Sequence, residues 1–169
     1  MTISILDDHA AVARLSCAAV GALTEAAIGA TFYRDDLSDT EVAANRRIPK
    51  MARELYATAA VNPDQAFSAA FVDGVFAGFA ISTRHGPGDH ELDWLMVHPE
   101  HHGGGVAAAL TERAIAWLGA DRPMWLNVLR HNARAISFYR RFGFEIDPDA
   151  KTGHVIPHWI MRRPGQAAP

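Results

Sequence analysis

The spacing of apolar and polar residues predicts two helices near the start of the chain. Asp7 and Asp8 can cap a helix over residues 9–22, which follows the short apolar run at 3–6 and carries its apolar side chains on one face. A second helical region is expected after Ser38-Asp39-Thr40. Because proline has no backbone N–H to donate, Pro49 should kink or split that region.

Two apolar runs in the middle of the chain predict a β-hairpin. Residues 66–72 and 75–82 flank Asp73-Gly74, a dipeptide that favours the tight turn between two antiparallel strands. Residues 84–90 are rich in glycine, histidine and charge, so we expect a mobile loop there before the next strand.

The last third of the chain predicts a short helix between strands. Asn132 can cap a helix that buries its apolar face and ends before Gly143. Three strands are expected, at residues 124–128, 144–146 and 154–161. Pro157 should place the last strand at an edge or a bulge, since proline cannot donate to a ladder. We expect one domain over 1–163 and a disordered tail over 164–169.

Composition narrows the class of protein. With 169 residues, 49% of them hydrophobic and 21% charged, the chain suits one globular domain with a core of its own. The net charge of −3 gives no reason to expect nucleic acid or a membrane as a partner. Cys17 is the only cysteine and the first residues do not resemble a signal peptide, so we expect a cytoplasmic protein.

The most informative segment lies between a strand ending at Val97 and a helix that stops near Gly119. Three glycines stand at this junction: Gly103, Gly104 and Gly105. Glycine lets the backbone approach an anion closely, and the free N–H groups of a helix's first turn attract negative charge. The segment therefore predicts a phosphate cradle, and its ligand is expected to be a phosphorylated cofactor.

Two motifs in this order resemble the GCN5-related N-acetyltransferase (GNAT) superfamily. The first is Val97-His98-Pro99-Glu100 followed by the glycines, and the second is residues 132–144, where Tyr139 precedes Phe142-Gly143-Phe144. The resemblance implies a single mixed α/β domain: a mostly antiparallel sheet of six or seven strands, helices on both faces, and a fourth and fifth strand that splay apart. The activity it implies is acetyl transfer to a primary amine of a small molecule, a peptide or a protein.

The resemblance also implies how acetyl-CoA, as co-substrate, is held. Its pantetheine arm would pair with the backbone of the fourth strand, at Leu95, Met96 and Val97. Its pyrophosphate would lie on the amides of His102, Gly103, Gly104, Gly105, Val106 and Ala107. His102 stands where the family usually has arginine or glutamine, and is either a phosphate neighbour or a solvated loop histidine. Asn132 matches an asparagine that contacts the pantetheine arm, and it can cap its helix as well.

Catalysis in such a site needs an acid, an oxyanion donor and a way to remove the amine's proton. Tyr139 matches the family's proton donor to the CoA sulfur, although it could instead be a packed aromatic. The oxyanion donor would be the backbone N–H near Met96 or Val97. Glu91 and Asp93 are both candidates for the base, because alternation places them on one face with Leu95 and Val97. A site without a dedicated base is also compatible with the family.

Three other interpretations remain open. The cluster of His98, His101 and His102 lacks the i, i+4 spacing of helical zinc sites, so no metal is expected. Residues 103–108 satisfy a dinucleotide-binding pattern, but five residues separate them from the preceding strand. A module that binds acyl-CoA without catalysis would share the fold. A homodimer is compatible with the sequence, which does not identify the acceptor.

Overall fold

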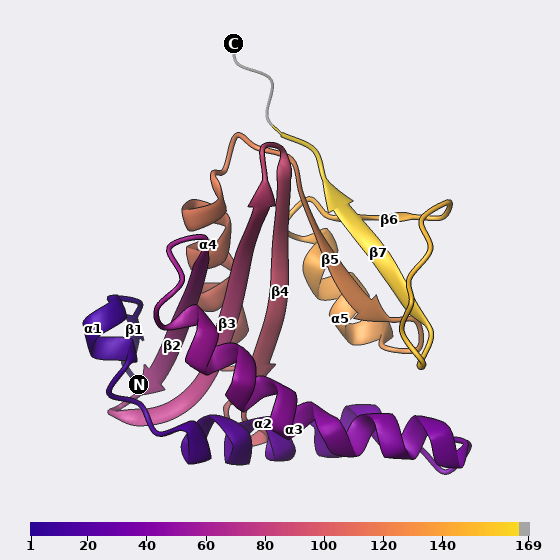
Figure 1. The fold of residues 1–169 in the computed structure, drawn as a ribbon, viewed down its shortest axis with the longest axis horizontal. Helices are drawn as coiled ribbons and strands as arrows, with labels where there is room; N and C mark the ends of the chain where they lie inside the picture. Colours follow the sequence, from indigo (N-terminus) through magenta and orange to yellow (C-terminus); the bar gives the residue numbers. More distant parts are fainter. Residues whose placement is uncertain (166–169) are drawn as a thin grey trace.

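A computed structural model describes residues 1–165, except for the side chains at positions 11 and 30. Within this range, seven strands form one sheet in the order β1-β2-β3-β4-β5-β7-β6 (Figure 1). The strands are β1 Ile3–Leu6, β2 Gln65–Val72, β3 Val75–Gly86, β4 Asp89–Val97, β5 Met124–Leu129, β6 Glu145–Asp147 and β7 His158–Arg163. β4 and β5 are parallel and all other neighbours are antiparallel, which confirms the expected mixed sheet. Most of the tail expected at 164–169 lies outside the described residues.

The first predicted helix is wrong in its extent. The chain forms a single turn, α1 His9–Val12, and then a longer helix, α2 Cys17–Phe32. Ser16 starts the second helix, because its side-chain oxygen accepts a hydrogen bond from the Ala18 amide at 3.1 Å. Capping by Ser16 therefore divides a segment whose apolar spacing alone predicts one helix.

The second helix, α3 Asp39–Ala59, is continuous through Pro49, so the predicted split does not occur. Its start is fixed by a capping box, in which the Ser38 hydroxyl accepts from the Glu41 amide while the Glu41 carboxylate accepts from the Ser38 amide. Tertiary packing outweighs the lost hydrogen bond at proline, since Ala52, Tyr56 and other residues beyond it are buried.

The hairpin at Asp73-Gly74 is confirmed. Both turn residues have positive φ, 48° and 84°, as the favoured two-residue turn requires. The mobile loop predicted at 84–90 is wrong, because β3 continues to Gly86 and β4 begins at Asp89. Gly88, with φ of 78°, makes the connecting turn, so a second tight hairpin replaces the loop.

The last strand also differs from its prediction. β7 begins after Pro157 and lies between β5 and β6, so it is an interior strand rather than an edge. Pro157 does not interrupt its ladder, since the residue stands one position before the strand and its carbonyl accepts from the Arg130 amide at 3.1 Å. The proline ends the preceding loop instead.

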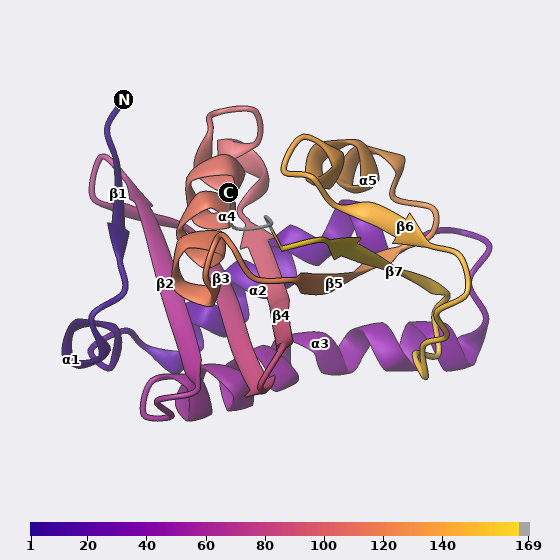
Figure 2. The same ribbon diagram turned by 90° about the horizontal axis from the view of Figure 1, so that it is seen from above.

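Helices cover both faces of the sheet (Figure 2). On one face α2 and α3 pack over β2 and β3. There the ring centroid of Phe67 lies 4.9 Å from that of Tyr56 and 5.0 Å from that of Phe79. On the other face lie α4 Val106–Leu118, which packs over β2, β3 and β4, and α5 Ala133–Arg140, which packs with apolar side chains of β5 and β7. The boundary between β4 and β5 lies in the middle of the sheet, between the two helical layers.

Candidate active site

Strands β4 and β5 separate soon after they meet. Their only backbone pairing within the described chain joins Glu91 to Trp125, and toward their other ends the strands diverge (Figure 1). This divergence confirms the splay that the family resemblance implies. Beyond the bridge, the edge of β4 that carries Leu95, Met96 and Val97 faces β5 without pairing to it.

A cleft of about 670 Å³ lies at this separation. Its walls come from α2 and α3 on one face of the sheet and from the α4 start and α5 on the other face. Leu95, Met96 and Val97 line it between the two sets of helices. The cleft therefore passes through the sheet, so that two ligands could enter from opposite faces and meet between the strands.

A β-bulge at Asp93 corrects the predicted faces of β4. Ser82 pairs with Leu92 and Ile81 with Trp94, so Asp93 is an extra residue without a partner on β3. Leu92 and Leu95 consequently pack against the same helical layer although they are three positions apart. Glu91 precedes the bulge and lies on the opposite face from Leu95 and Val97, whereas strict alternation predicted one shared face.

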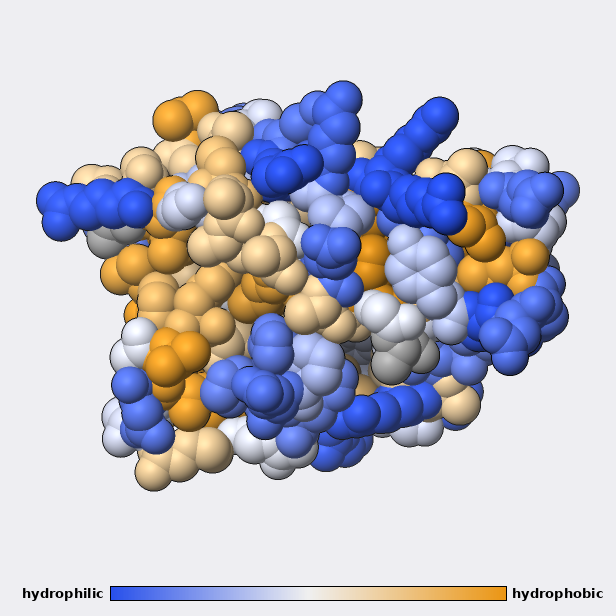
Figure 3. Space-filling view, turned by 90° about the horizontal axis from the view of Figure 1, so that it is seen from below, coloured by the Kyte–Doolittle hydropathy of each residue, from blue (hydrophilic) through white to orange (hydrophobic). Residues whose placement is uncertain are grey.

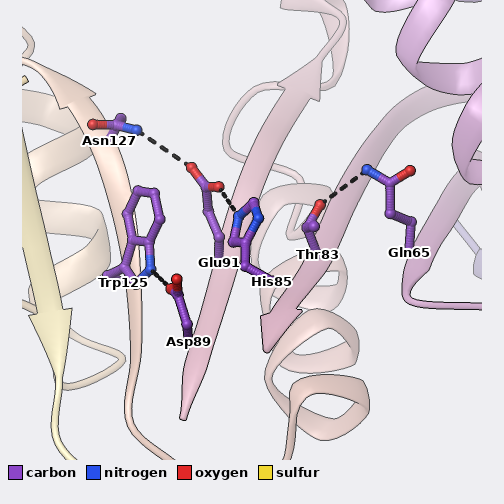
Figure 4. A network of polar contacts seen from close by, with 7 residues as sticks. All are labelled: Gln65, Thr83, His85, Asp89, Glu91, Trp125 and Asn127. Carbon is purple, nitrogen blue, oxygen red and sulfur yellow. Dashed lines mark hydrogen bonds and ion pairs between the residues drawn. The ribbon is translucent and has the colours of Figure 1, made fainter. Parts of the chain in front are cut away.

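Glu91 is held in a polar network on the face toward α2 and α3 (Figure 4). Its Oε2 lies 2.6 Å from His85 Nε2, and its Oε1 accepts from Asn127 Nδ2 at 3.3 Å. The residue is 6% exposed, and burial raises the pKa of its carboxyl while the His85 contact opposes that change. Both oxygens are thus occupied by protein groups, and Glu91 is not part of the cleft wall.

Asp93 lies in the cleft wall two residues later. Burial, and next the negative charge of Glu91, raise the pKa of Asp93 from 3.8 to about 7, while His85 lowers it. No side-chain hydrogen bond of Asp93 is found among residues 1–165. Of the two predicted base candidates, Asp93 is the carboxylate that faces the cleft.

Tyr139 reaches the cleft from α5. Its ring is 8% exposed and packs edge-on against Phe138 and Phe144, with ring centroids 5.2 and 6.0 Å away. Burial raises the pKa of the phenol, so the hydroxyl keeps its proton. Both sequence interpretations are therefore compatible with the structure, since a packed ring can present its hydroxyl to a ligand.

The glycine segment leaves several backbone donors available. Gly105, with φ of 88°, stands at the N-cap of α4, and no side chain caps this helix. In the described part of the chain, the amides of Gly103, Gly105, Val106 and Ala107 donate to no protein acceptor. The amides of His102 and Gly104 differ, because they donate to Pro99 and His101 carbonyls at 3.1 and 3.3 Å. Four of the six predicted donors thus fit an anion.

His102 and Asn132 border the cleft near this helix start. The His102 ring Nε2 lies 3.1 Å from the Val97 carbonyl, which ties the loop to the end of β4. Asn132 caps α5 by accepting from the Ala135 amide at 3.0 Å, so its side-chain NH₂ stays free for a ligand. The capping role predicted for Asn132 is confirmed.

Three polar residues of this region were not singled out from the sequence as site residues. His85 and Asn127 hold Glu91. Asn127 could have been predicted as a site residue, because it is a polar side chain inside the otherwise apolar strand 124–128. Asn45 lies fully buried in the cleft wall, where its Nδ2 donates to the Phe32 carbonyl at 2.7 Å and its Oδ1 has no partner. A buried carbonyl oxygen left in this state costs about 1–3 kcal/mol.

Metal ligation and membrane insertion are two further properties that the described residues bear on. No group of three or more histidine, cysteine or acidic side chains there could hold a metal ion. No helix within residues 1–165 is both long enough and apolar enough to cross a membrane.

Comparison with known proteins gives one family. Residues 30–144 match the family model described as acetyltransferase (GNAT) family. Uncharacterized N-acetyltransferases of Mycobacterium bovis and Mycobacterium tuberculosis are 40% identical over 90 residues, which cover 51% of this chain and 56% of each relative. The chain thus spans about half the length of the curated relatives it matches.

Solved structures share the fold. The PaiA N-acetyltransferase of Thermoplasma acidophilum, crystallised in complex with coenzyme A, has a TM-score of 0.72 at 22% identity and covers 97% of this chain and 99% of its own. Nourseothricin acetyltransferase is 32% identical over 61% of this chain and 66% of its own, with a TM-score of 0.51.

Proposed function

Because the chain belongs to the acetyltransferase (GNAT) family, we propose that it transfers the acetyl group of acetyl-CoA directly to a primary amine. The observation that carries this proposal is the cleft that crosses the sheet between β4 and β5. Direct transfer needs the thioester and the amine to meet in one place, and this cleft has a wall from each helical layer. The coenzyme A in the Thermoplasma structure of the same fold supports the choice of co-substrate.

The residues around the α4 start fit the phosphates of acetyl-CoA. The free amides of Gly103, Gly105, Val106 and Ala107 would bind the pyrophosphate, together with the positive end of the helix dipole. The unpaired edge of β4 at residues 95–97 would hydrogen-bond the pantetheine arm, as a further strand would. Asn132 would contact the same arm with its free NH₂ group.

Asp93 is the residue that would accept the amine's proton. It faces the cleft and carries a pKa of about 7, which suits a base working near neutral pH. Glu91 would act through Asp93, because its own oxygens are held by His85 and Asn127. The charge that develops on the thioester oxygen would be stabilised by the backbone N–H of Met96 or Val97.

Tyr139 would donate its proton to the departing thiolate of CoA. Its hydroxyl stays protonated because burial raises its pKa, and α5 holds the ring at the cleft. The amine loses one proton to Asp93 and the thiolate gains one from Tyr139. Transfer through bulk water restores both groups, so no covalent intermediate with the protein is needed.

Release of CoA thiol from acetyl-CoA in the presence of an amine panel tests the proposal. We expect thiol release that depends on the amine, together with acetyl-CoA binding measured by calorimetry. Binding of acetyl-CoA without thiol release from any amine would instead indicate a module that binds acyl-CoA without catalysis. Absence of binding by folded protein would overturn both.

A further inference from the structure

The wall of the cleft on the α2 and α3 side is mostly apolar, and its described lining residues carry no charge. Its apolar members are Ala27, Phe32, Ala44, Ile48, Met51 and Leu55, and Trp94 and Met96 of β4 continue it. Thr31 and Asn45 are the uncharged polar residues of this wall, and Asn45 Oδ1 has no partner among the described residues. Figure 3, the view of this side of the molecule, shows hydrophobic surface recessed between polar side chains. An acceptor that enters from this side therefore lies mainly against hydrocarbon and aromatic surface.

The cleft contains very little negative charge. Asp93 is its only carboxylate among the described lining residues. Asp36 and Glu41 line a separate pocket that shares Ile156 with the cleft. Both are already engaged, since Asp36 pairs with Arg34 and Glu41 belongs to the capping box of α3. A second ammonium group in the cleft would thus lose its water without finding a carboxylate in return.

Two histidines that line the cleft are uncharged at neutral pH, so they add no positive charge to it. His154 and His158 line the cleft with ring centroids 4.3 Å apart. Burial lowers the pKa of both, to about 4 for His158. At neutral pH these two rings therefore present uncharged aromatic surface, which extends the apolar wall rather than repelling or attracting a charged body.

We propose that the acceptor is a primary monoamine whose remaining body is apolar and uncharged. This inference rests on the proposed acetyl transfer and names its substrate class. The amine group approaches Asp93 between the strands, while the body lies along α2, α3 and these two histidines. A diamine or polyamine of the same length places its second ammonium against that wall, which lacks a carboxylate to pair with it.

A matched pair of substrates tests the proposal. Hexylamine and 1,6-diaminohexane have the same chain length and differ in one terminal group, methyl or ammonium. With saturating acetyl-CoA, kcat/KM for hexylamine should exceed that for 1,6-diaminohexane by roughly tenfold or more, because an unpaired ammonium is costly to desolvate. Equal rates, or a faster diamine, would overturn the proposed selectivity while leaving acetyl transfer intact.

Two variants at one position provide the control. Met51 lines the cleft and is 46% exposed, so it tolerates a polar side chain. Met51→Glu adds the missing carboxylate and should raise kcat/KM for the diamine relative to hexylamine, whereas Met51→Gln should leave the ratio near that of the wild type. If both variants change the ratio equally, charge is not the determinant and the inference is wrong. If no amine releases thiol, the proposed function fails and the inference fails with it.

Discussion

Asp93 shows how a single residue can favour catalysis at the expense of stability. Burial raises its pKa from 3.8 to about 7, so the folded protein binds this proton more tightly than the unfolded chain does. The stability that the group contributes is therefore present at low pH and is lost as pH rises from 3.8 to about 7. Above that range the charged carboxylate is a constant destabilising feature.

Asp93→Asn tests both roles of this residue. Acetyl transfer should fall by about 100-fold or more, since a positioned base contributes at least that factor. At pH 8 the variant should melt at a higher temperature than the wild type, and the difference should disappear near pH 4, where Asp93 is neutral. Retained activity with an unchanged pH profile would remove Asp93 as the base.

Substitutions of His85 and of Glu91 should shift the pH profile of acetyl transfer in opposite directions. Glu91 raises the pKa of Asp93 and His85 lowers it. Glu91→Gln should therefore let activity begin at lower pH, and His85→Gln should delay it to higher pH. Among the described lining residues, α2, α3 and β5 contribute no charge, and the charged or titratable groups besides Asp93 are His102, Arg134, Tyr139, His154 and His158. Shifts of the same sign in kcat/KM against pH would indicate structural damage only.

Tyr139→Phe should lower turnover without weakening acetyl-CoA binding. The substitution keeps the ring that packs against Phe138 and Phe144 and removes only the hydroxyl. We expect kcat to fall by about 100-fold, within the range for a general acid, while calorimetry gives an unchanged dissociation constant. A kcat equal to that of the wild type would mean that another donor, or water, protonates the thiolate.

At the scale of single elements, α4 is a helix whose start is left uncapped. A capping side chain at this position would stabilise the helix over glycine by roughly a few tenths of a kcal/mol. Gly105 contributes no such bond, and the amides of the first turn stay available instead. The helix start is therefore less stable than it could be and is suited to an anion from outside the chain.

Gly105→Glu should abolish acetyl-CoA binding, because a carboxylate would take the place of the phosphates. Its φ of 88° strains any other residue, so Gly105→Ala is the matched control. The alanine variant should lose about 1–2 kcal/mol of stability and should bind acetyl-CoA more tightly than the glutamate variant. Melting curves measure the backbone strain in both variants, and calorimetry measures their affinity for acetyl-CoA. Equal affinities of the two variants for acetyl-CoA would argue against the phosphate cradle.

Sequence periodicity predicted most elements but not the local irregularities that shape the site. The hairpin at Asp73-Gly74 and the cap at Asn132 depend on neighbouring residues, and both were predictable. The bulge at Asp93 was not, because it arises from how β3 and β4 pair, and alternation along one strand cannot reveal it. The same limitation applies to β7, whose interior place depends on pairing with two distant strands.

For the whole molecule, ligand binding should be visible as added stability. A ligand at 100 times its dissociation constant stabilises the folded state by about 2.7 kcal/mol. In a chain of this size each kcal/mol raises Tm by about 2–4 °C, so acetyl-CoA should raise Tm by about 5–10 °C. A melting curve with and without acetyl-CoA measures this, and the Gly105→Glu variant should show no rise.

Because β4 and β5 pair only at Glu91 and Trp125 within the described chain, each of these two strands has an unpaired edge in the interior of the sheet. Unpaired strand edges can pair with strands of other chains. Here helices flank these edges on both faces of the sheet, so only an extended ligand arm can enter between them. Occupancy would join a four-stranded half and a three-stranded half into one hydrogen-bonded surface. Amide exchange should then slow on loading at those residues of 95–97 whose N–H groups point toward β5, because they gain an acceptor.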